Sequence, residues 1–172
     1  MIRNKRLTIL MASIFSIAVL VAIASGVFRV EDRLSFETIA QNDFSDYEQE
    51  MPALFIIAGD EDVDILANML HPRLIRQLRQ LDYNQVFAIL ALQGRKGQGG
   101  FKTTVQGIGR LNDQVNVRTE FITPVLGSLN SQIFTSPYHL VVVRKEGRWG
   151  QPIQFALIVN GEVLMSTTHF IP

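Results

Sequence analysis

The chain has 172 residues and contains no cysteine. This absence excludes both a disulfide framework and a lipid-modified cysteine. A domain folded from this sequence must therefore be stabilised by its own hydrophobic core. The chain also lacks a Gly-x-Ser-x-Gly motif, so a serine nucleophile on a strand-to-helix turn has no local support.

Charge is missing from one long segment near the N-terminus. Leu7 to Phe28 is a run of 22 uncharged residues, preceded directly by the basic residues Arg3, Lys5 and Arg6. A helix of this length reaches about 33 Å, which is enough to cross a hydrocarbon core of about 30 Å. Residues 7–28 are therefore predicted to form a transmembrane signal anchor. The basic flank predicts a cytoplasmic N-terminus, which makes the chain a single-pass protein of the cell membrane with an extracytoplasmic C-terminal domain.

The same segment also fits a cleaved signal peptide, because Ala22-Ile23-Ala24 followed by Ser25 matches a small-x-small cleavage site. The apolar stretch continues to Phe28, however, and is longer than a secretory signal needs, which favours the uncleaved anchor. The sequence thus predicts a basic tail and anchor over residues 1–29 and one extracytoplasmic domain over residues 30–172. Cleavage after Ala24 would instead give a secreted protein.

Acidic and basic residues balance at 16 each, but they are segregated along the chain. Eleven acidic residues and one basic residue, Arg33, lie between Glu31 and Asp64. Eight basic residues lie between Ile65 and Arg118, against two acidic ones. Such segregation is typical of solvated surface, of two halves that dock on each other, or of two different partners. The compartment and the scattered basic residues argue against nucleic acid as a partner.

Hydrophobic periodicity predicts two short helices followed by a run of strands. Asp60 is expected to cap the first helix, and Pro72 to open the second, which extends to about Leu81. Asn160-Gly161 is expected to be the turn of a hairpin. Together these elements predict an α+β domain with a mainly antiparallel sheet behind the transmembrane helix. The expected strands are 34–40, 53–58, 86–92, 101–111, 115–121, 133–145 (interrupted at Ser136-Pro137), 154–159 and 162–166.

Two loops resemble ligand-binding motifs only in part. The glycine-rich stretch from Gly94 to Gly100 is followed by an alternating strand pattern, whereas a phosphate loop must open a helix. It is better explained as a loop with positive φ at several positions. Asp60, Asp62 and Asp64 resemble the start of a calcium loop, but the glycine and the closing glutamate that such a loop needs are missing.

The three histidines, His71, His139 and His169, do not have the spacing of a metal-binding helix. They are interpreted as structural or exposed residues. No catalytic, cofactor-binding or metal-ligating residue is assigned, no cofactor is predicted, and the domain is expected not to be an enzyme.

Several short motifs occur in a characteristic order between Asp82 and Lys145. Asp82-Tyr83 is followed by an apolar strand, by Gly99-Gly100-Phe101, by Pro124 with Gly127, and by the segment 135–139, whose sequence is Thr-Ser-Pro-Tyr-His. In this order and spacing they resemble the C-terminal domain of the protease complex subunit PrcB family. Two departures from the family stand out. Some members are lipoproteins, whereas this chain has no cysteine to acylate, so its apolar helix would have to be the anchor. The residue after Gly-Gly is Phe101 where tyrosine is expected, so the ring lacks a hydroxyl.

The resemblance implies a non-catalytic partner that assists the assembly or stability of an envelope protease. The expected role is therefore a membrane-anchored extracytoplasmic protein-interaction module, whose partner is an envelope protease or another extracytoplasmic protein. Pro137 belongs either at a sheet edge or at the start of a strand. If it marks an exposed edge, a partner segment could add there as a strand. The alternative is a small-ligand-binding or hydrolytic envelope domain with a pocket that gathers Tyr138, His139 and a carboxylate. A purely structural envelope component is a third possibility.

Overall fold

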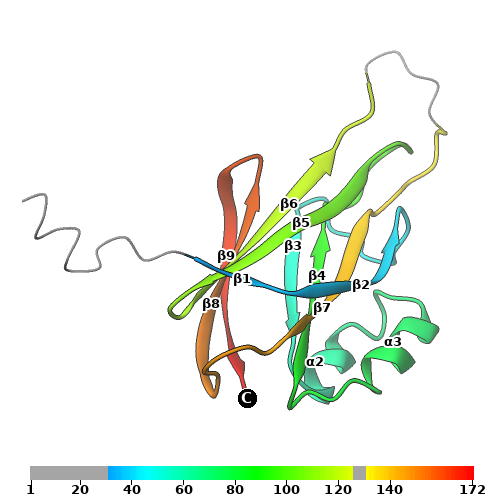
Figure 1. Cartoon of the computed structure of the whole chain (residues 1–172). Helices are drawn as coiled ribbons and strands as arrows, with labels where there is room; N and C mark the ends of the chain where they lie inside the picture. The colour runs from blue at the N-terminus through cyan, green and yellow to red at the C-terminus, as the bar shows by residue number, and fades with distance from the viewer. Residues whose placement is uncertain (1–30, 126–130) are drawn as a thin grey trace, which may run out of the picture. The chain divides into compact units, whose positions relative to one another are not determined.

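The described part of the chain comprises residues 31–125 and 131–172 of a computed structural model, in which Asp32–Pro172 forms one unit (Figure 1). Turn chemistry sets several element boundaries: Asn160 and Gly161 have φ angles of 54° and 87°, as a type I′ hairpin turn requires. The elements in chain order are β1 (Asp32–Leu34), β2 (Phe36–Asn42), β3 (Ala53–Ile57), α2 (Asp60–Ile65), α3 (Pro72–Leu78), β4 (Val86–Leu92), β5 (Lys102–Leu111), β6 (Gln114–Ile122), β7 (Tyr138–Arg144), β8 (Gln151–Val159) and β9 (Glu162–Ile171).

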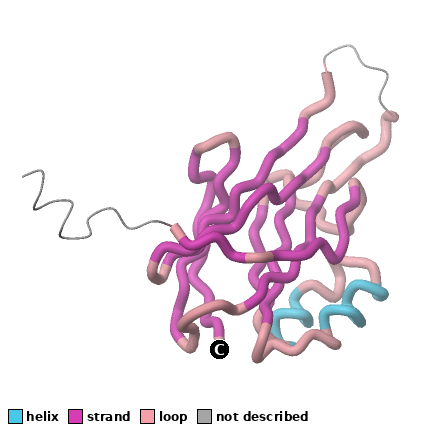
Figure 2. The backbone as a smooth tube through the Cα atoms, in the orientation of Figure 1, coloured by secondary structure: helices cyan, strands magenta, loops and turns pink. Residues whose placement is uncertain are grey.

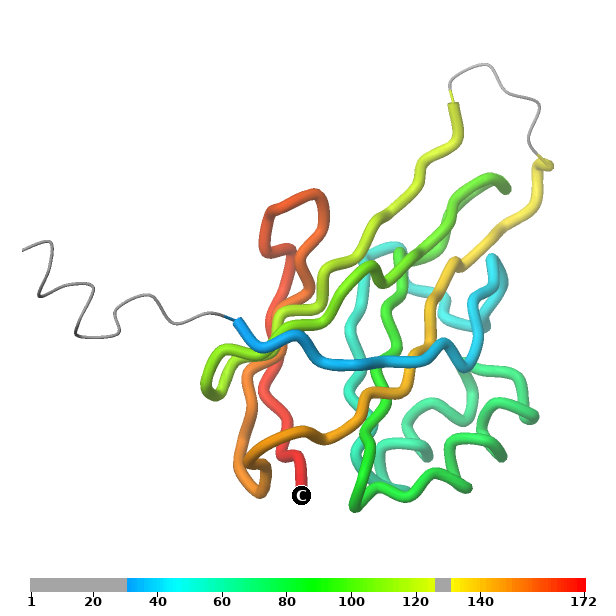
Figure 3. The backbone as a smooth tube through the Cα atoms, viewed as in Figure 1, coloured from blue at the N-terminus to red at the C-terminus, as the bar shows by residue number. Residues whose placement is uncertain are grey.

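These strands form two sheets. Sheet A has the order β1-β5-β6-β8-β9, and sheet B has the order β2-β7-β4-β3. Neighbouring strands are antiparallel except for β6 and β8, which are parallel. Only Ser35 separates β1 from β2, so one continuous segment passes from sheet A to sheet B, as the blue tube in Figure 3 shows.

The main hydrophobic core lies between the two sheets. Sheet A contributes alternate residues of its strands, among them Val115 and Val117 of β6 and Phe155 of β8. Sheet B contributes Phe87 and Ile89 from β4. Alternation in these strands places every second side chain on the same face, so both sheets present an apolar face to this core.

The other face of sheet B is covered by the two helices (Figure 2). Val63 and Leu66 from the α2 region and Leu78 from α3 are fully buried against Leu90 and Leu140 of the sheet. Sheet B is thus apolar on both faces, which explains why β4 is an almost continuous hydrophobic run in the sequence.

The helix starts differ in one detail from the sequence-based expectation. The N-cap of α2 is Gly59, and Asp60 is the first helical residue. The side chain of Asp62 accepts a hydrogen bond of 2.8 Å from the backbone N–H of Ala58. Pro72 opens α3 as expected, and Nδ1 of His71 accepts the N–H of Arg73 at 3.2 Å.

The α+β prediction is wrong. The described residues are mostly strand, and the two helices, six and seven residues long, form only a partial cover on one sheet. The strands were expected to form one mainly antiparallel sheet, but they divide between two sheets that pack face to face. The alternation of apolar and polar residues in a strand shows which of its faces is buried, but not which sheet the strand joins. The sequence therefore does not reveal the division into two sheets.

The predicted strand 133–145, with its interruption at Ser136-Pro137, forms only after the interruption, because β7 begins at Tyr138. Moreover, β7 lies between β2 and β4, so Pro137 does not mark a sheet edge. The proline is tolerated because it precedes the first ladder residue.

The predicted transmembrane segment 7–28 lies outside the described residues. Within residues 31–125 and 131–172, no helix has the length and apolar character needed to cross a bilayer.

Candidate functional site at the loop end

Three loops meet at one end of sheet B, and we call residues 43–51, 93–101 and 131–137 the loop end. The backbone N–H of Ser136 donates to the carbonyl of Asp43 at 2.9 Å, and that of Arg95 donates to Gln49 at 2.8 Å. Lys96 and Thr135 exchange two backbone hydrogen bonds of 2.7 and 3.0 Å. Segments distant in the sequence are therefore joined through their backbones.

The glycine-rich stretch from Gly94 to Gly100 allows the backbones of these loops to approach closely. Gly94 has a φ of +84°, and a Cβ at this position would lie 2.2 Å from the carbonyl oxygen of Glu50. A Cβ at Gly99 would lie 2.5 Å from Oγ of Ser131. Positive φ is thus confirmed at Gly94 and also at Gly100, where φ is 89°. The glycine-rich stretch is followed by strand β5 and not by a helix, as the sequence predicted.

Two of the motifs that carry the resemblance to the PrcB family, Gly99-Gly100-Phe101 and residues 135–139, come together here. The hydroxyl of Thr135 is buried and donates to the carbonyl of Gln98 at 2.9 Å, and the N–H of Gly99 donates to Ser131 at the same distance. Behind them, the hydroxyl of Thr103 donates to the carbonyl of Pro137 at 3.1 Å. The Gly-Gly-aromatic motif and the 135–139 segment therefore form one structural unit.

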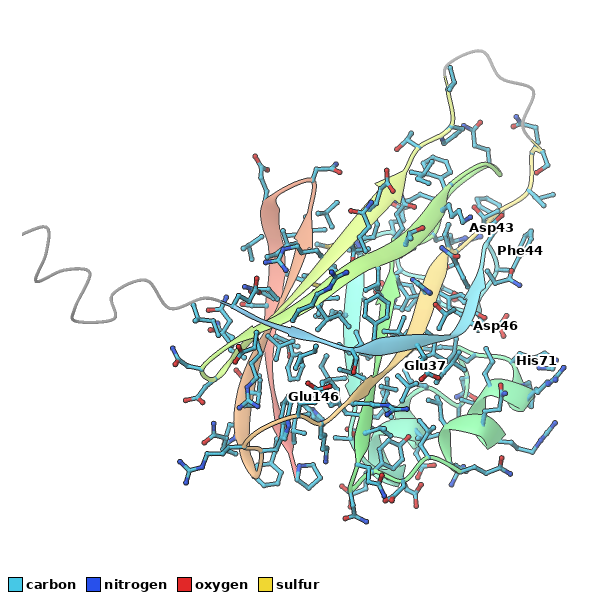
Figure 4. All side chains as sticks on the ribbon, viewed as in Figure 1. Glu37, Asp43, Phe44, Asp46, His71 and Glu146 are labelled. Atoms are coloured by element: carbon cyan, nitrogen blue, oxygen red, sulfur yellow. The ribbon has the colours of Figure 1, made fainter. Side chains whose placement is uncertain are left out.

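Large apolar side chains are exposed on this end of the domain. Met51 is 76% exposed and Phe134 is 65% exposed. The guanidinium of Arg95 lies 4.1 Å from the ring centroid of Phe134, a cation–π contact that holds the ring at the surface. Phe44, labelled in Figure 4 beside Asp43 at the end of β2, is also more than half exposed.

The loops that carry these apolar residues also carry charges of both signs. The first loop carries Asp43, Asp46, Glu48 and Glu50, whereas the second carries Arg95 and Lys96. An apolar centre with a charged rim is the usual composition of a protein-binding surface. Elsewhere, the acidic and basic segments of the sequence meet in the ion pair of Asp64 with Arg79, whose half-exposed side chains contribute little stability.

His139 lies behind the loop end and joins the two sheets. Its Nδ1 accepts the N–H of Val105 in β5 at 2.8 Å, so the other ring nitrogen carries the proton. Nε2 then donates to the hydroxyl of Thr38 in β2, also at 2.8 Å. Burial, assisted by the positive charge of Lys102, lowers the pKa of His139 and keeps the ring neutral.

Tyr138 and His139 do not share a pocket. Tyr138 packs in the cluster beneath the helices, whereas His139 points toward β5 on the opposite face of sheet B. Consecutive residues of a strand face opposite ways, so the pocket expected for a hydrolytic or ligand-binding site is not formed by this pair. Burial raises the pKa of the Tyr138 phenol, which keeps it protonated.

The remaining candidates are separated in space. His71 caps α3, and His169 on β9 lies 3.1 Å from Oδ2 of Asp62. Asp62 also binds the backbone of Ala58, and Asp64 pairs with Arg79, so the acidic residues of α2 serve local contacts. Among the residues that the structure describes, no group of three or more potential metal ligands is found.

A cavity of about 390 Å³ lies beneath β2, away from the loop end. Apolar side chains of Phe36, Leu81 and Val142 line it, and Glu37 and Glu146 stand at its rim, where Figure 4 labels them. The hydroxyl of Ser35 donates to Oε1 of Glu146 at 3.0 Å, and Glu37 pairs with Arg144 at 3.7 Å, so both rim carboxylates already have partners within the domain.

Comparison with protein-family models, curated proteins and solved structures found no match to this chain. The exposed residues Phe44, Met51 and Phe134 were not singled out from the sequence. Phe44 and Met51 are isolated large apolar residues at the two ends of an otherwise polar, acidic loop, and this contrast was the available signal.

Proposed function

We propose that this chain is a membrane-anchored, extracytoplasmic and non-catalytic protein-interaction module that binds its partner through the loop end. The observation that carries the proposal is the presence of exposed large apolar side chains, Phe44, Met51 and Phe134, on loops that are joined by backbone hydrogen bonds. Exposed large apolar residues rimmed by charge are typical of protein-binding surfaces.

The loop end is also suited to binding because its backbone is held in place. The hydrogen bonds between the three loops fix the positions of Phe134 and its neighbours before a partner arrives. A preformed surface loses less conformational entropy on association than a flexible one. The resemblance to the PrcB family suggests an envelope protease as the partner, and the predicted anchor over residues 7–28 would hold the module at the membrane.

The test is an affinity pull-down of the tagged full-length chain from gently solubilised membranes, with partners identified by mass spectrometry. The variant F134S removes the exposed ring of Phe134, and I65S is its matched control, because Ile65 on α2 is 60% exposed and lies outside the loop end. We expect an envelope protein in stoichiometric amounts with the wild type and with I65S. Recovery with F134S should fall about tenfold or more, as for a hot-spot aromatic residue.

Equal recovery with F134S and the wild type would show that the loop end is not the binding surface. Recovery of no specific partner would contradict the interaction role. The cavity beneath β2 would then be the place to screen for small ligands. Thermal unfolding of both variants shows whether a loss of binding reflects a loss of fold.

A further inference from the structure

The cavity beneath β2 lies on a face of sheet B that the two helices cover only in part. Directly paired residues of neighbouring strands share a face, and the register pairs Glu37 with Val142. On the same side, Val86 pairs with Arg144. Val142 lies two residues after Leu140, which is fully buried beneath the helices, so both face the same way. The helical cover thus ends before Val142, which remains partly exposed.

The cavity has the size and the lining of a small-molecule site. Its volume of about 390 Å³ falls in the range of about 300–1,000 Å³ that is usual for ligand pockets. Four apolar side chains from different segments line it, and each is only partly buried by the domain itself. They are Phe36 of β2, Leu81 after α3, Val86 of β4 and Val142 of β7. A ligand that enters the cavity would therefore remove apolar surface from water.

The charged side chains of the lining carry two negative charges and one positive charge. They are the carboxylates of Glu37 and Glu146 and the guanidinium of Arg144. Arg144 already pairs with Glu37 at 3.7 Å. Lys145 follows in the chain, but its Nζ donates to two backbone carbonyl oxygens, at 2.6 and 2.7 Å, and it does not line the cavity. The lining therefore has an excess of negative charge.

Glu146 is the carboxylate that can receive a charged ligand group. Its Oε1 accepts the hydroxyl of Ser35 at 3.0 Å, which is a neutral partner. The ion pairs recorded among the described residues all involve other carboxylates, so within residues 31–125 and 131–172 no cation neutralises Glu146. An ionised carboxylate has two acceptor oxygens, so the bond from Ser35 leaves capacity for a charged donor.

We propose that the cavity beneath β2 binds a small organic cation, with a primary ammonium group on a short apolar chain. The ammonium group donates to the carboxylate of Glu146 in a charge-assisted hydrogen bond. The apolar chain lies against Leu81, Val86 and Val142. The ring of Phe36 suits the same ligand, because the face of an aromatic ring attracts cations.

A cationic ligand fits this cavity better than an anionic or a neutral one. An anion would have to bind Arg144, whose guanidinium is shared with Glu37, and its charge would lie near two carboxylates. Apolar walls strengthen such repulsion, because they lower the local dielectric constant. A neutral molecule would fill the apolar part of the cavity but leave Glu146 without a charged partner. Ligands that share one apolar chain are therefore expected to bind in the order cation, neutral molecule, anion.

The probes that test this order are n-butylammonium, n-butanol and butyrate, which share a short apolar chain and differ in charge. The amine is protonated near pH 7.5, because an alkylammonium group loses its proton only near the pKa of lysine, about 10.4. A ligand of this size is expected to bind in about the millimolar range. Sodium chloride at the same concentration is the control for ionic strength.

The readout is the proton–nitrogen NMR correlation spectrum of the full-length chain in an uncharged detergent, which itself offers no ammonium group. Trp149 is the only tryptophan of the chain, and its indole N–H donates to the carbonyl of Glu146 at 3.0 Å. This indole signal and the backbone amide signals of Glu37 and Val142 should shift saturably with n-butylammonium. We expect n-butylammonium to bind at least about tenfold more tightly than butyrate, with n-butanol between the two.

The variant E146Q tests the assignment to this carboxylate. Glutamine can still accept the hydroxyl of Ser35 but carries no charge, so the affinity for n-butylammonium should fall about fivefold or more, while that for n-butanol stays the same. The matched control is E162Q, because Glu162 is an exposed residue of β9 that does not line the cavity.

Three results would each overturn the proposal. The first is binding of n-butanol or butyrate as tight as that of n-butylammonium. The second is an affinity of E146Q for n-butylammonium equal to that of the wild type and of E162Q. The third is the absence of a saturable shift up to about 50 mM n-butylammonium, well above the expected dissociation constant.

Discussion

Replacement of His139 by leucine should destabilise the domain by removing the polar link between its two sheets. The side chain is only 4% exposed, and it joins β5 to β2 through Val105 and Thr38. Leucine has a similar volume, so the substitution removes the hydrogen bonds without opening a large cavity. Glutamine is the matched control, because its amide can accept from one partner and donate to the other.

The magnitude follows from the two hydrogen bonds. Val105 is 3% exposed, so its N–H would remain buried without an acceptor, at a cost of about 1–3 kcal/mol. Thr38 is exposed and can bond to water instead, so the loss there is smaller, about 0.5 kcal/mol. We therefore expect H139L to lower the free energy of unfolding by about 1.5–3.5 kcal/mol near pH 7.5. H139Q should lose less than half of that amount.

The pH dependence gives a second signature. Burial lowers the pKa of His139 in the folded state, so the unfolded chain binds a proton at a higher pH than the folded domain does. The contribution to stability is complete above the unfolded pKa of about 6.5 and is lost as pH falls toward the lower folded pKa. The slope reaches at most about 1.4 kcal/mol per pH unit for this single group.

Urea unfolding of the wild type and of both variants, between pH 5 and pH 8, measures both quantities. The difference between wild type and H139L isolates the contribution of His139, because the other titrating groups are common to both proteins. That difference should shrink as pH falls below about 6.5. A stability of H139L equal to that of the wild type, or a difference independent of pH, would refute this account of the buried histidine.

Two further predictions concern the anchor and the loop end. Deletion of residues 1–29 should give a soluble, monodisperse fragment with cooperative unfolding, because the described core uses only residues 34–171; aggregation of this fragment would count against the domain boundary. G94A should destabilise that fragment by about 3 kcal/mol or more, since φ is +84° and the new Cβ would meet the Glu50 carbonyl. G97A is the control and should change stability by less than about 0.5 kcal/mol, because nothing lies within 4 Å of a Cβ there. Equal effects of the two substitutions in thermal unfolding would show that the loop end is not rigid at Gly94.

The elements that the sequence predicted well are those that local chemistry determines. The Asn160-Gly161 turn, the proline at the start of α3 and the apolar run of β4 each depend on a few neighbouring residues. Dihedral preferences, capping and face periodicity act over such short distances, so one segment of sequence carries the whole signal. The positive φ angles in the glycine-rich loop were predictable for the same reason.

Tertiary structure decided the rest. Ser35 passes the chain from one sheet to the other, β6 pairs in parallel with β8, and β7 occupies the middle of sheet B despite Pro137. These pairings join residues far apart in sequence, and each alternating strand pattern is compatible with many partners. The same holds for the loop end, because three segments far apart in the sequence must come together to form it. Local patterns determined the strands of this protein, whereas only the competition among their possible partners determined its sheets and its exposed surfaces.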